Sequence, residues 1–89
     1  MKSIEVTLIN SVGLHARPAA FFIKTAQEFA SEITIECNNR SADGKSLLDI
    51  LTLGAVKGTT IKIIANGIDE DESINKLMTI VKDGLGEEG

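Results

Sequence analysis

The chain contains no tryptophan or tyrosine and only three phenylalanines, so aliphatic side chains have to form its core. It has a single cysteine, Cys37, which excludes an internal disulfide and agrees with a reducing compartment. Because Cys37 ends an alternating strand pattern, we interpret it as a small buried hydrophobic side chain rather than a reactive thiol.

Long apolar runs are also missing. No run approaches the ~18 residues needed to cross a bilayer, and the N-terminus lacks a basic start followed by the apolar stretch of a signal peptide. We therefore expect a cytoplasmic protein without a membrane-inserted segment. The length of 89 residues suits one domain, residues 1–89, with one core.

Positive charge is sparse. The net charge is −4, and residues 69–89 contain seven acidic but only two basic residues. Direct nucleic-acid binding requires clustered lysine and arginine, so this composition argues against it. Metal binding at the only histidine, His15, is disfavoured because Arg17 would place a cation beside a cation and further ligands are missing. We expect no metal and no cofactor.

The hydrophobic spacing predicts seven elements in the order β-α-β-β-α-β-α. Period-two alternation predicts strands over residues 3–9, 31–37 and 59–66, with a brief strand at 40–42. Helical spacing predicts helices over residues 16–29 and 47–53, and a last helix from 69 to just before 84. The tail, residues 84–89, is expected to fray. One mostly antiparallel sheet with helices on one face, an α+β fold, fits this order.

The stretch GLHARPAA, residues 13–20, holds both the only histidine and the only proline. If the first helix begins at Ala16, His15 is its N-cap, and the amides of Ala16 and Arg17 have no intrahelical partners. Pro18 has no amide, so its place in the first turn costs no hydrogen bond. Free amides and the positive end of the helix dipole favour an anion of phosphate size.

The chemistry that fits this anion site is phosphoryl transfer through a histidine. Imidazole is a nucleophile near neutral pH, and the guanidinium of Arg17 can bind phosphoryl oxygens bidentately. The other interpretation is that His15 is a polar N-cap and Arg17 a solvated charge, and spacing alone does not separate the two.

With its surroundings, GLHARPAA resembles the active-site signature of the HPr family, the histidine-containing phosphocarriers of the bacterial sugar phosphotransferase system. The likeness extends over essentially the whole chain: the element order, the KSL segment around Ser46, the TLG-x-x-x-G run at 52–58 and the acidic start of the last helix. The resemblance implies an open-faced β-sandwich, a four-stranded antiparallel sheet with three helices on one face.

The resemblance also implies roles for residues. His15 would be phosphorylated at Nδ1, and Arg17 would stabilise the phosphoryl group. Enzyme I, charged by phosphoenolpyruvate, would be the donor, and the IIA domains of sugar transporters the acceptors. The chain would then be a monomeric carrier that acts as a substrate between enzymes, not a stand-alone catalyst.

A docking surface around His15 is implied in the same way. Phe21 lies off the apolar stripe of its helix, and the helix over residues 47–53 is apolar nearly all round, so some of its leucines have to lie outside the core. Leu47 and Leu48 are favoured for the interface. The docking residues implied by the resemblance are Ala20, Phe21, Lys24, Gln27, Leu47, Leu48, Leu51 and Thr52, with Arg17, Lys24 and Lys45 as charges for acidic partners.

Ser46 is a candidate N-cap, with Asp49 three residues on in a capping-box pattern. The resemblance implies phosphorylation of Ser46 by an HPr kinase/phosphorylase, which would add ~1.5 to 2 negative charges and lower transfer from Enzyme I. Asp49 departs from the family, which more often has a small or uncharged residue there, and its carboxylate would repel that phosphate.

Two further functions stay open. One is a mainly regulatory protein that acts through phospho-Ser46 as the corepressor partner of a LacI-type catabolite regulator; the presence of His15 argues against a purely regulatory role. The other is a small adaptor without phosphoryl chemistry.

Overall fold

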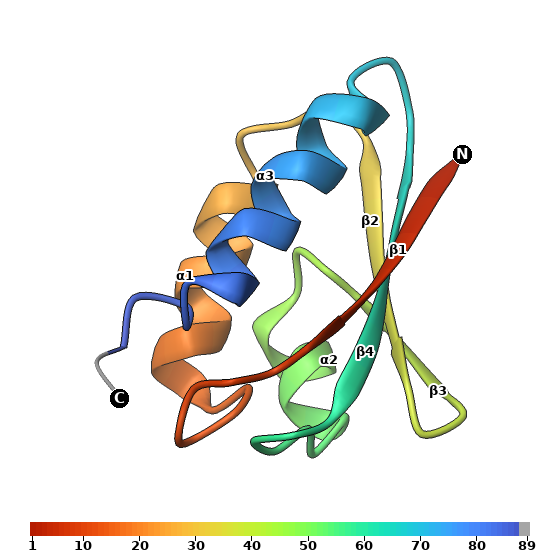
Figure 1. Cartoon of the computed structure of the whole chain (residues 1–89). Coiled ribbons are helices and arrows are strands. Elements are labelled where there is room, and N and C mark those ends of the chain that lie inside the picture. Colours follow the sequence, from red (N-terminus) through yellow and green to blue (C-terminus); the bar gives the residue numbers. More distant parts are fainter. Residues whose placement is uncertain (88–89) are drawn as a thin grey trace.

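Seven elements follow one another in the predicted order. The structure is a computed structural model of the chain and describes residues 1–87. The elements are β1 (Lys2–Thr7), α1 (Ala16–Ala26), β2 (Glu32–Cys37), β3 (Arg40–Asp43), α2 (Leu47–Thr52), β4 (Thr60–Asn66) and α3 (Glu70–Lys82) (Figure 1).

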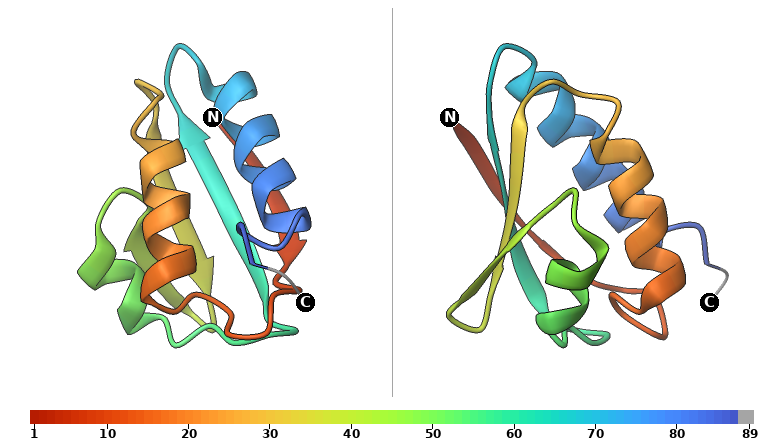
Figure 2. Two further views of the ribbon diagram at one scale, coloured as in Figure 1. Left: turned by 90° about the vertical axis from the view of Figure 1, so that its left-hand side faces the viewer. Right: turned by 180° about the vertical axis from the view of Figure 1, so that it is seen from behind.

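The four strands form one sheet in the order β1-β4-β2-β3, and every neighbouring pair is antiparallel. All three helices lie on one face, so the other face of the sheet is open (Figure 2). This arrangement confirms the predicted α+β open-faced sandwich.

The core lies between the sheet and the helices and is almost entirely aliphatic. On the central strands Ile35 faces Ile63, and Val6 of β1 is paired with Ile61 of β4. Phe22 is fully buried, whereas the other two phenylalanines are not. Cys37 is buried and unpaired, and desolvation raises the pKa of its thiol, in agreement with a structural role.

The predicted end of the first helix is wrong by three residues, because α1 ends at Ala26. The Glu28 and Phe29 amides donate to carbonyls three residues back, which tightens the chain into a turn. This turn brings the Ala30 amide to the Asp69 carboxylate of the α3 start, at 2.7 Å, and the Ser31 amide to the same carboxylate at 2.9 Å. A long-range contact therefore overrides the helical spacing.

The predicted fraying of the tail is wrong for residues 84–87, while residues 88–89 lie outside the described part. The Gly84 amide donates to Val81 and the Leu85 amide to Ile80, at 3.0 and 2.8 Å, which is the Schellman arrangement of a helix C-terminus. Gly84 supplies the left-handed conformation with φ 88°, and Leu85 is 2% exposed.

None of the helices in residues 1–87 is long and apolar enough to span a bilayer.

Candidate functional site

His15 is the N-cap of α1, as predicted. Its backbone is extended, with φ −71° and ψ 177°, its carbonyl accepts from the Ala19 amide at 2.9 Å, and its side chain is exposed. Among the hydrogen bonds of residues 1–87, none is donated by the amides of Ala16 or Arg17. Both amides are therefore free to bind an anion at the start of an 11-residue helix.

The electrostatics of this helix start favour negative charge. α1 has no acidic residue in its first turn, so no carboxylate of its own neutralises the positive end of the dipole. Arg17 and Lys24 are both exposed, and neither belongs to an ion pair within residues 1–87. Their charges are available to an incoming anion or acidic partner.

A second chain segment supports the loop that precedes His15. The Leu14 amide donates to the Ala55 carbonyl at 2.9 Å. A Cβ atom at position 13 would lie only 2.6 Å from Val56 Cα, and Gly13 has φ 59°, so glycine is required here for space and for conformation. The two motifs that carry the family resemblance, residues 13–20 and 52–58, thus touch.

His15 lines a shallow hollow of about 170 Å³ at this junction. Leu51 of α2 lines the same hollow, which brings the two predicted parts of the site together. Gly54, Ala55 and Val56 also line it, and none of the three is an individually predicted site residue. Val56 is 61% exposed. Its position within the TLG-x-x-x-G run was the feature of the sequence that could have identified it as a site residue.

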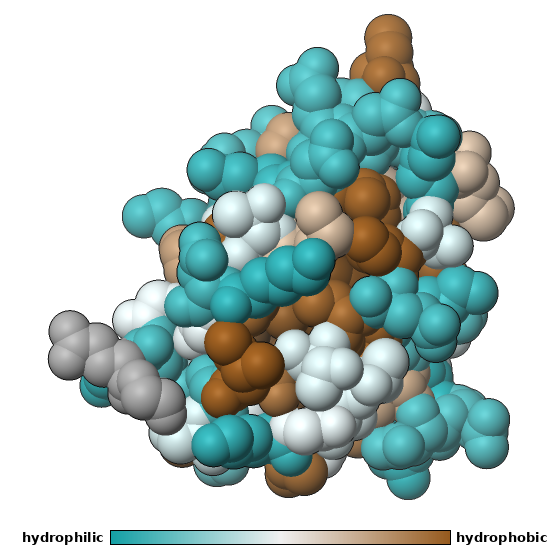
Figure 3. All heavy atoms as spheres, viewed as in Figure 1, coloured by the Kyte–Doolittle hydropathy of each residue, from teal (hydrophilic) through white to brown (hydrophobic). Residues whose placement is uncertain are grey.

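The residues expected to form a docking surface are exposed on α1, at its C-terminal end and on α2. Within α2 the apolar side chains differ in burial: the three leucines are exposed, Leu48 most of all at 77%, whereas Ile50 is fully buried. The predicted docking residues classed as exposed are Ala20, Phe21, Lys24, Gln27, Leu47, Leu48, Leu51 and Thr52. Hydrophobic atoms reach the surface at the lower edge of Figure 3, the end of the molecule where the loops before α1 and after α2 lie.

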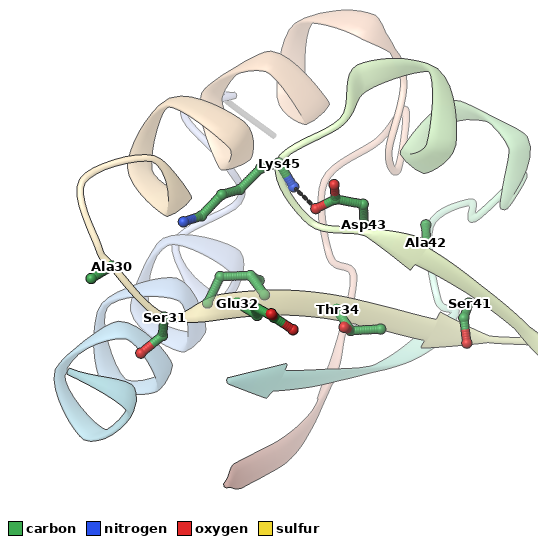
Figure 4. A pocket seen from close by; sticks show the side chains of 9 residues that line it. Ala30, Ser31, Glu32, Thr34, Ser41, Ala42, Asp43 and Lys45 are labelled. Atoms are coloured by element: carbon green, nitrogen blue, oxygen red, sulfur yellow. Dashed lines mark hydrogen bonds between the residues drawn. The ribbon is translucent and has the colours of Figure 1, made fainter. Parts of the chain in front are cut away.

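Lys45 lies away from His15. Its ammonium donates to the Phe29 carbonyl at 2.8 Å, beyond the C-terminal end of α1, while His15 is at the N-terminal end. Lys45 borders a separate hollow of about 530 Å³, together with Glu32, Asp43 and the Ser41 hydroxyl (Figure 4). Its charge is therefore partly engaged within the protein.

Ser46 is the N-cap of α2, as predicted, and its hydroxyl accepts from the Asp49 amide at 3.4 Å. The reciprocal bond of a capping box is absent among residues 1–87: the Asp49 carboxylate accepts from the Asp43 amide, and the Ser46 amide donates to the Asp43 carbonyl. Two carboxylates, from Asp43 and Asp49, thus hydrogen-bond at the start of α2.

Within residues 1–87 the structure contains no group of three His, Cys, Asp or Glu side chains that could hold a metal ion.

The fold and the site together define a class: a small open-faced α+β protein with an exposed histidine at the N-cap of a helix whose first two amides have no partner among residues 1–87. A family model for the PTS HPr component phosphorylation site matches residues 2–83. The chain therefore belongs to the HPr family of phosphotransferase-system phosphocarriers, and this membership supports a phosphocarrier role.

Individual relatives agree with this assignment. The chain is 43% identical over 81 residues to phosphocarrier protein HPr of Haemophilus influenzae, covering 91% of this chain and 95% of that protein. The crystal structure of HPr-C-His from Thermoanaerobacter tengcongensis matches with a TM-score of 0.96 and 40% identity over 100% of both chains. Crh, a catabolite repression protein of Bacillus subtilis described as a swapped, intertwined dimer, matches with a TM-score of 0.76 and 32% identity over 98% of this chain and 100% of that one.

Proposed function

We propose that this chain accepts a phosphoryl group on His15 from phospho-Enzyme I and passes it to the IIA domains of sugar transporters. The observation that carries the proposal is the exposed His15 side chain at the N-cap of α1, where the Ala16 and Arg17 amides have no partner among residues 1–87 and Arg17 is exposed on the same first turn.

In the proposed reaction a neutral imidazole nitrogen of His15, Nδ1 by the family resemblance, attacks the phosphorus atom of the donor phosphohistidine. The new N–P bond forms as the donor N–P bond breaks, and the donor imidazole leaves with the electron pair of that bond. The amides of Ala16 and Arg17 and the Arg17 guanidinium bind the phosphoryl oxygens, where negative charge is concentrated during transfer. Transfer to a IIA domain is the same displacement at phosphorus. A nucleophile of that domain attacks, and the His15 imidazole is the leaving group.

The partner surface of the proposal consists of the exposed residues of α1 and α2 around His15. Phe21, Leu47, Leu48 and Leu51 are each at least 38% exposed and offer apolar contacts. Arg17 and Lys24 add positive charge for acidic partners, with Lys45 at the far end of the surface. A small surface of this kind allows the fast release that a carrier between enzymes needs.

Incubation with Enzyme I and labelled phosphoenolpyruvate tests the proposal. We expect label on the parent that is labile in acid and stable in base, and none on His15→Ala. Absence of label on the parent, or equal label on His15→Ala, would contradict the proposal.

We further propose that phosphorylation of Ser46 by an HPr kinase/phosphorylase regulates this transfer. A phosphate on Ser46 would lie at one end of α2, and Leu51, which shares the His15 hollow, lies near the other end, about 7.5 Å further along the helix axis for a step of five residues. The Asp43 and Asp49 carboxylates oppose this modification by repulsion.

Mass analysis after incubation with the kinase and ATP decides this point. One phosphate on the parent and none on Ser46→Ala is the expected outcome. Equal labelling of both proteins would rule out Ser46 as the site.

The similarity to Crh keeps a second function in view: regulation through phospho-Ser46 with a LacI-type catabolite regulator as partner. The nucleophile at position 15 favours the carrier function, because a corepressor has no need of it. We propose a cytoplasmic monomer, in contrast to the intertwined Crh dimer, and sedimentation of the purified chain distinguishes the two states.

A further inference from the structure

The segment that follows α3, residues 84–87, lies against the part of the chain that leads into α1 (Figures 1 and 2). A Cβ atom built at Gly86 would lie 3.2 Å from the ring of Phe21, so the backbone of this segment runs close to that side chain. The Glu87 carboxylate accepts a hydrogen bond from Nδ2 of Asn10 at 2.8 Å. Residues near both ends of the sequence therefore meet at the loop between β1 and α1, which leads to His15.

Asn10 is a polar side chain that is only 2% exposed. Its Nδ2 group has two N–H donors, and it uses them for the Gly13 carbonyl, at 2.7 Å, and for Glu87. Because a carbonyl and a carboxylate only accept, the amide nitrogen has to face both. Oδ1 is left buried without a donor among residues 1–87. The unfavourable burial of this oxygen is offset by the two bonds of the nitrogen.

The hydrogen bond from Asn10 to the Gly13 carbonyl constrains the backbone that leads to His15. The peptide unit between Gly13 and Leu14 is planar, so fixing both of its polar ends fixes its orientation. Its carbonyl accepts from Asn10, and its amide donates to the Ala55 carbonyl at 2.9 Å. Leu14 is buried, and the next residue is the proposed nucleophile.

We propose that Asn10 and Glu87 are positioning residues that hold the peptide unit between Gly13 and Leu14, which leads to His15, in the orientation needed for phosphoryl transfer. Asn10 orients this unit, and Glu87 holds the Asn10 amide from the other side. The inference rests on the function proposed above, because its consequence is the geometry of the His15 imidazole at the moment of transfer.

Steady-state kinetics with Enzyme I and phosphoenolpyruvate, with this chain as the varied substrate, test the proposal through Glu87. We expect Glu87→Ala to lower kcat about tenfold with an unchanged KM, because misplacement affects the reaction and not the docking. Glu87→Gln keeps an acceptor oxygen and is expected to stay within about twofold of the parent. Glu72→Ala, an exposed change on α3, serves as the matched control with parental kinetics.

A double-mutant cycle distinguishes a positioning role of Asn10 and Glu87 from a nonspecific loss of structure. Asn10→Ala is expected to lower kcat at least as much as Glu87→Ala, and adding Glu87→Ala to it is expected to change nothing more, because the two side chains act through one bond. Asn75→Ala, an exposed substitution within α3, is the matched control. If Asn10→Ala fails to fold, Glu87→Ala and Glu87→Gln still decide the question.

Parental kcat in Glu87→Ala, or an equal loss in Glu87→Gln, would overturn the inference while leaving the carrier function intact. Absence of phosphorylation in the parent would instead overturn the carrier function. Amide NMR of the unphosphorylated protein tests the positioning itself: Glu87→Ala is expected to shift the Gly13, Leu14 and His15 resonances and Glu72→Ala to leave them in place. Unmoved resonances in Glu87→Ala would overturn the inference.

Discussion

At the scale of single residues, the site depends on a glycine that has no chemistry of its own. Gly13 meets two separate demands, a left-handed backbone with φ 59° and space for the Val56 backbone. Gly54 meets only the first, because its φ is 62° and a Cβ atom there would have no neighbour within 4 Å in the described part of the chain, residues 1–87. The two positions therefore allow conformational strain to be separated from steric contact.

We expect Gly13→Ala to lower the free energy of unfolding by about 2 to 4 kcal/mol, from backbone strain plus overpacking. The control, Gly54→Ala, is expected to cost only the strain, about 1 kcal/mol. Urea unfolding of the three proteins measures both values. Equal costs at the two positions would show that the contact with Val56 does not constrain the loop.

Arg17 is the second residue whose role is specific. Because its side chain is exposed on the first turn, Arg17→Glu is expected to slow transfer from Enzyme I by about 100-fold and to leave the thermal midpoint nearly unchanged. Arg17→Lys keeps the charge but loses the bidentate geometry, so an intermediate rate is expected. A thermal midpoint lowered by many degrees in Arg17→Glu would contradict this placement.

At the scale of the elements, Asp69 joins the loop between α1 and β2 to the start of α3. Its carboxylate accepts from the Ser31 hydroxyl and from the Ala30 and Ser31 amides. The hydrogen bond from the Ser31 hydroxyl, followed by that from the Ala30 amide, lowers the pKa of Asp69. Folding therefore favours the ionised form.

This shift predicts the direction of a pH effect. The stabilisation is fully present above the unfolded pKa, near 4 for an aspartate, and is lost as pH falls through the lower pKa of the folded state. Asp69→Asn is expected to lose less stability than the parent between pH 6 and pH 2 in urea unfolding. The control is Asp71→Asn, which removes an exposed ion pair with Lys2, and it is expected to follow the parent. If the stability of Asp69→Asn falls with pH as steeply as that of the parent, the stabilising role of the Asp69 hydrogen bonds is contradicted.

At the scale of the whole molecule, local patterns predicted the seven elements and the N-caps of α1 and α2. They were sufficient because periodicity and capping depend on neighbouring residues. The end of α1 and the Asn10–Glu87 contact depend on residues 38 to 77 positions apart, and spacing along the sequence does not encode them. The Schellman end at Gly84 and Leu85 is the exception, because glycine followed by an apolar residue was a readable signal.

The joining of two distant segments is also what completes the proposed site. The loop before α1 and the loop after α2 meet through the Leu14 to Ala55 hydrogen bond, which places Leu51 and Val56 in the same hollow as His15. The proposed carrier function therefore depends on the whole fold and not on the motif at residues 13–20 alone.

The most direct measurement is phosphorus and amide NMR of the chain before and after phosphorylation by Enzyme I and phosphoenolpyruvate. The predicted result is one phosphorus atom on Nδ1 of His15, with large shifts at the Ala16 and Arg17 amides as they bind the phosphoryl oxygens. A phosphorus atom on another residue, or unmoved Ala16 and Arg17 amides, would contradict the account.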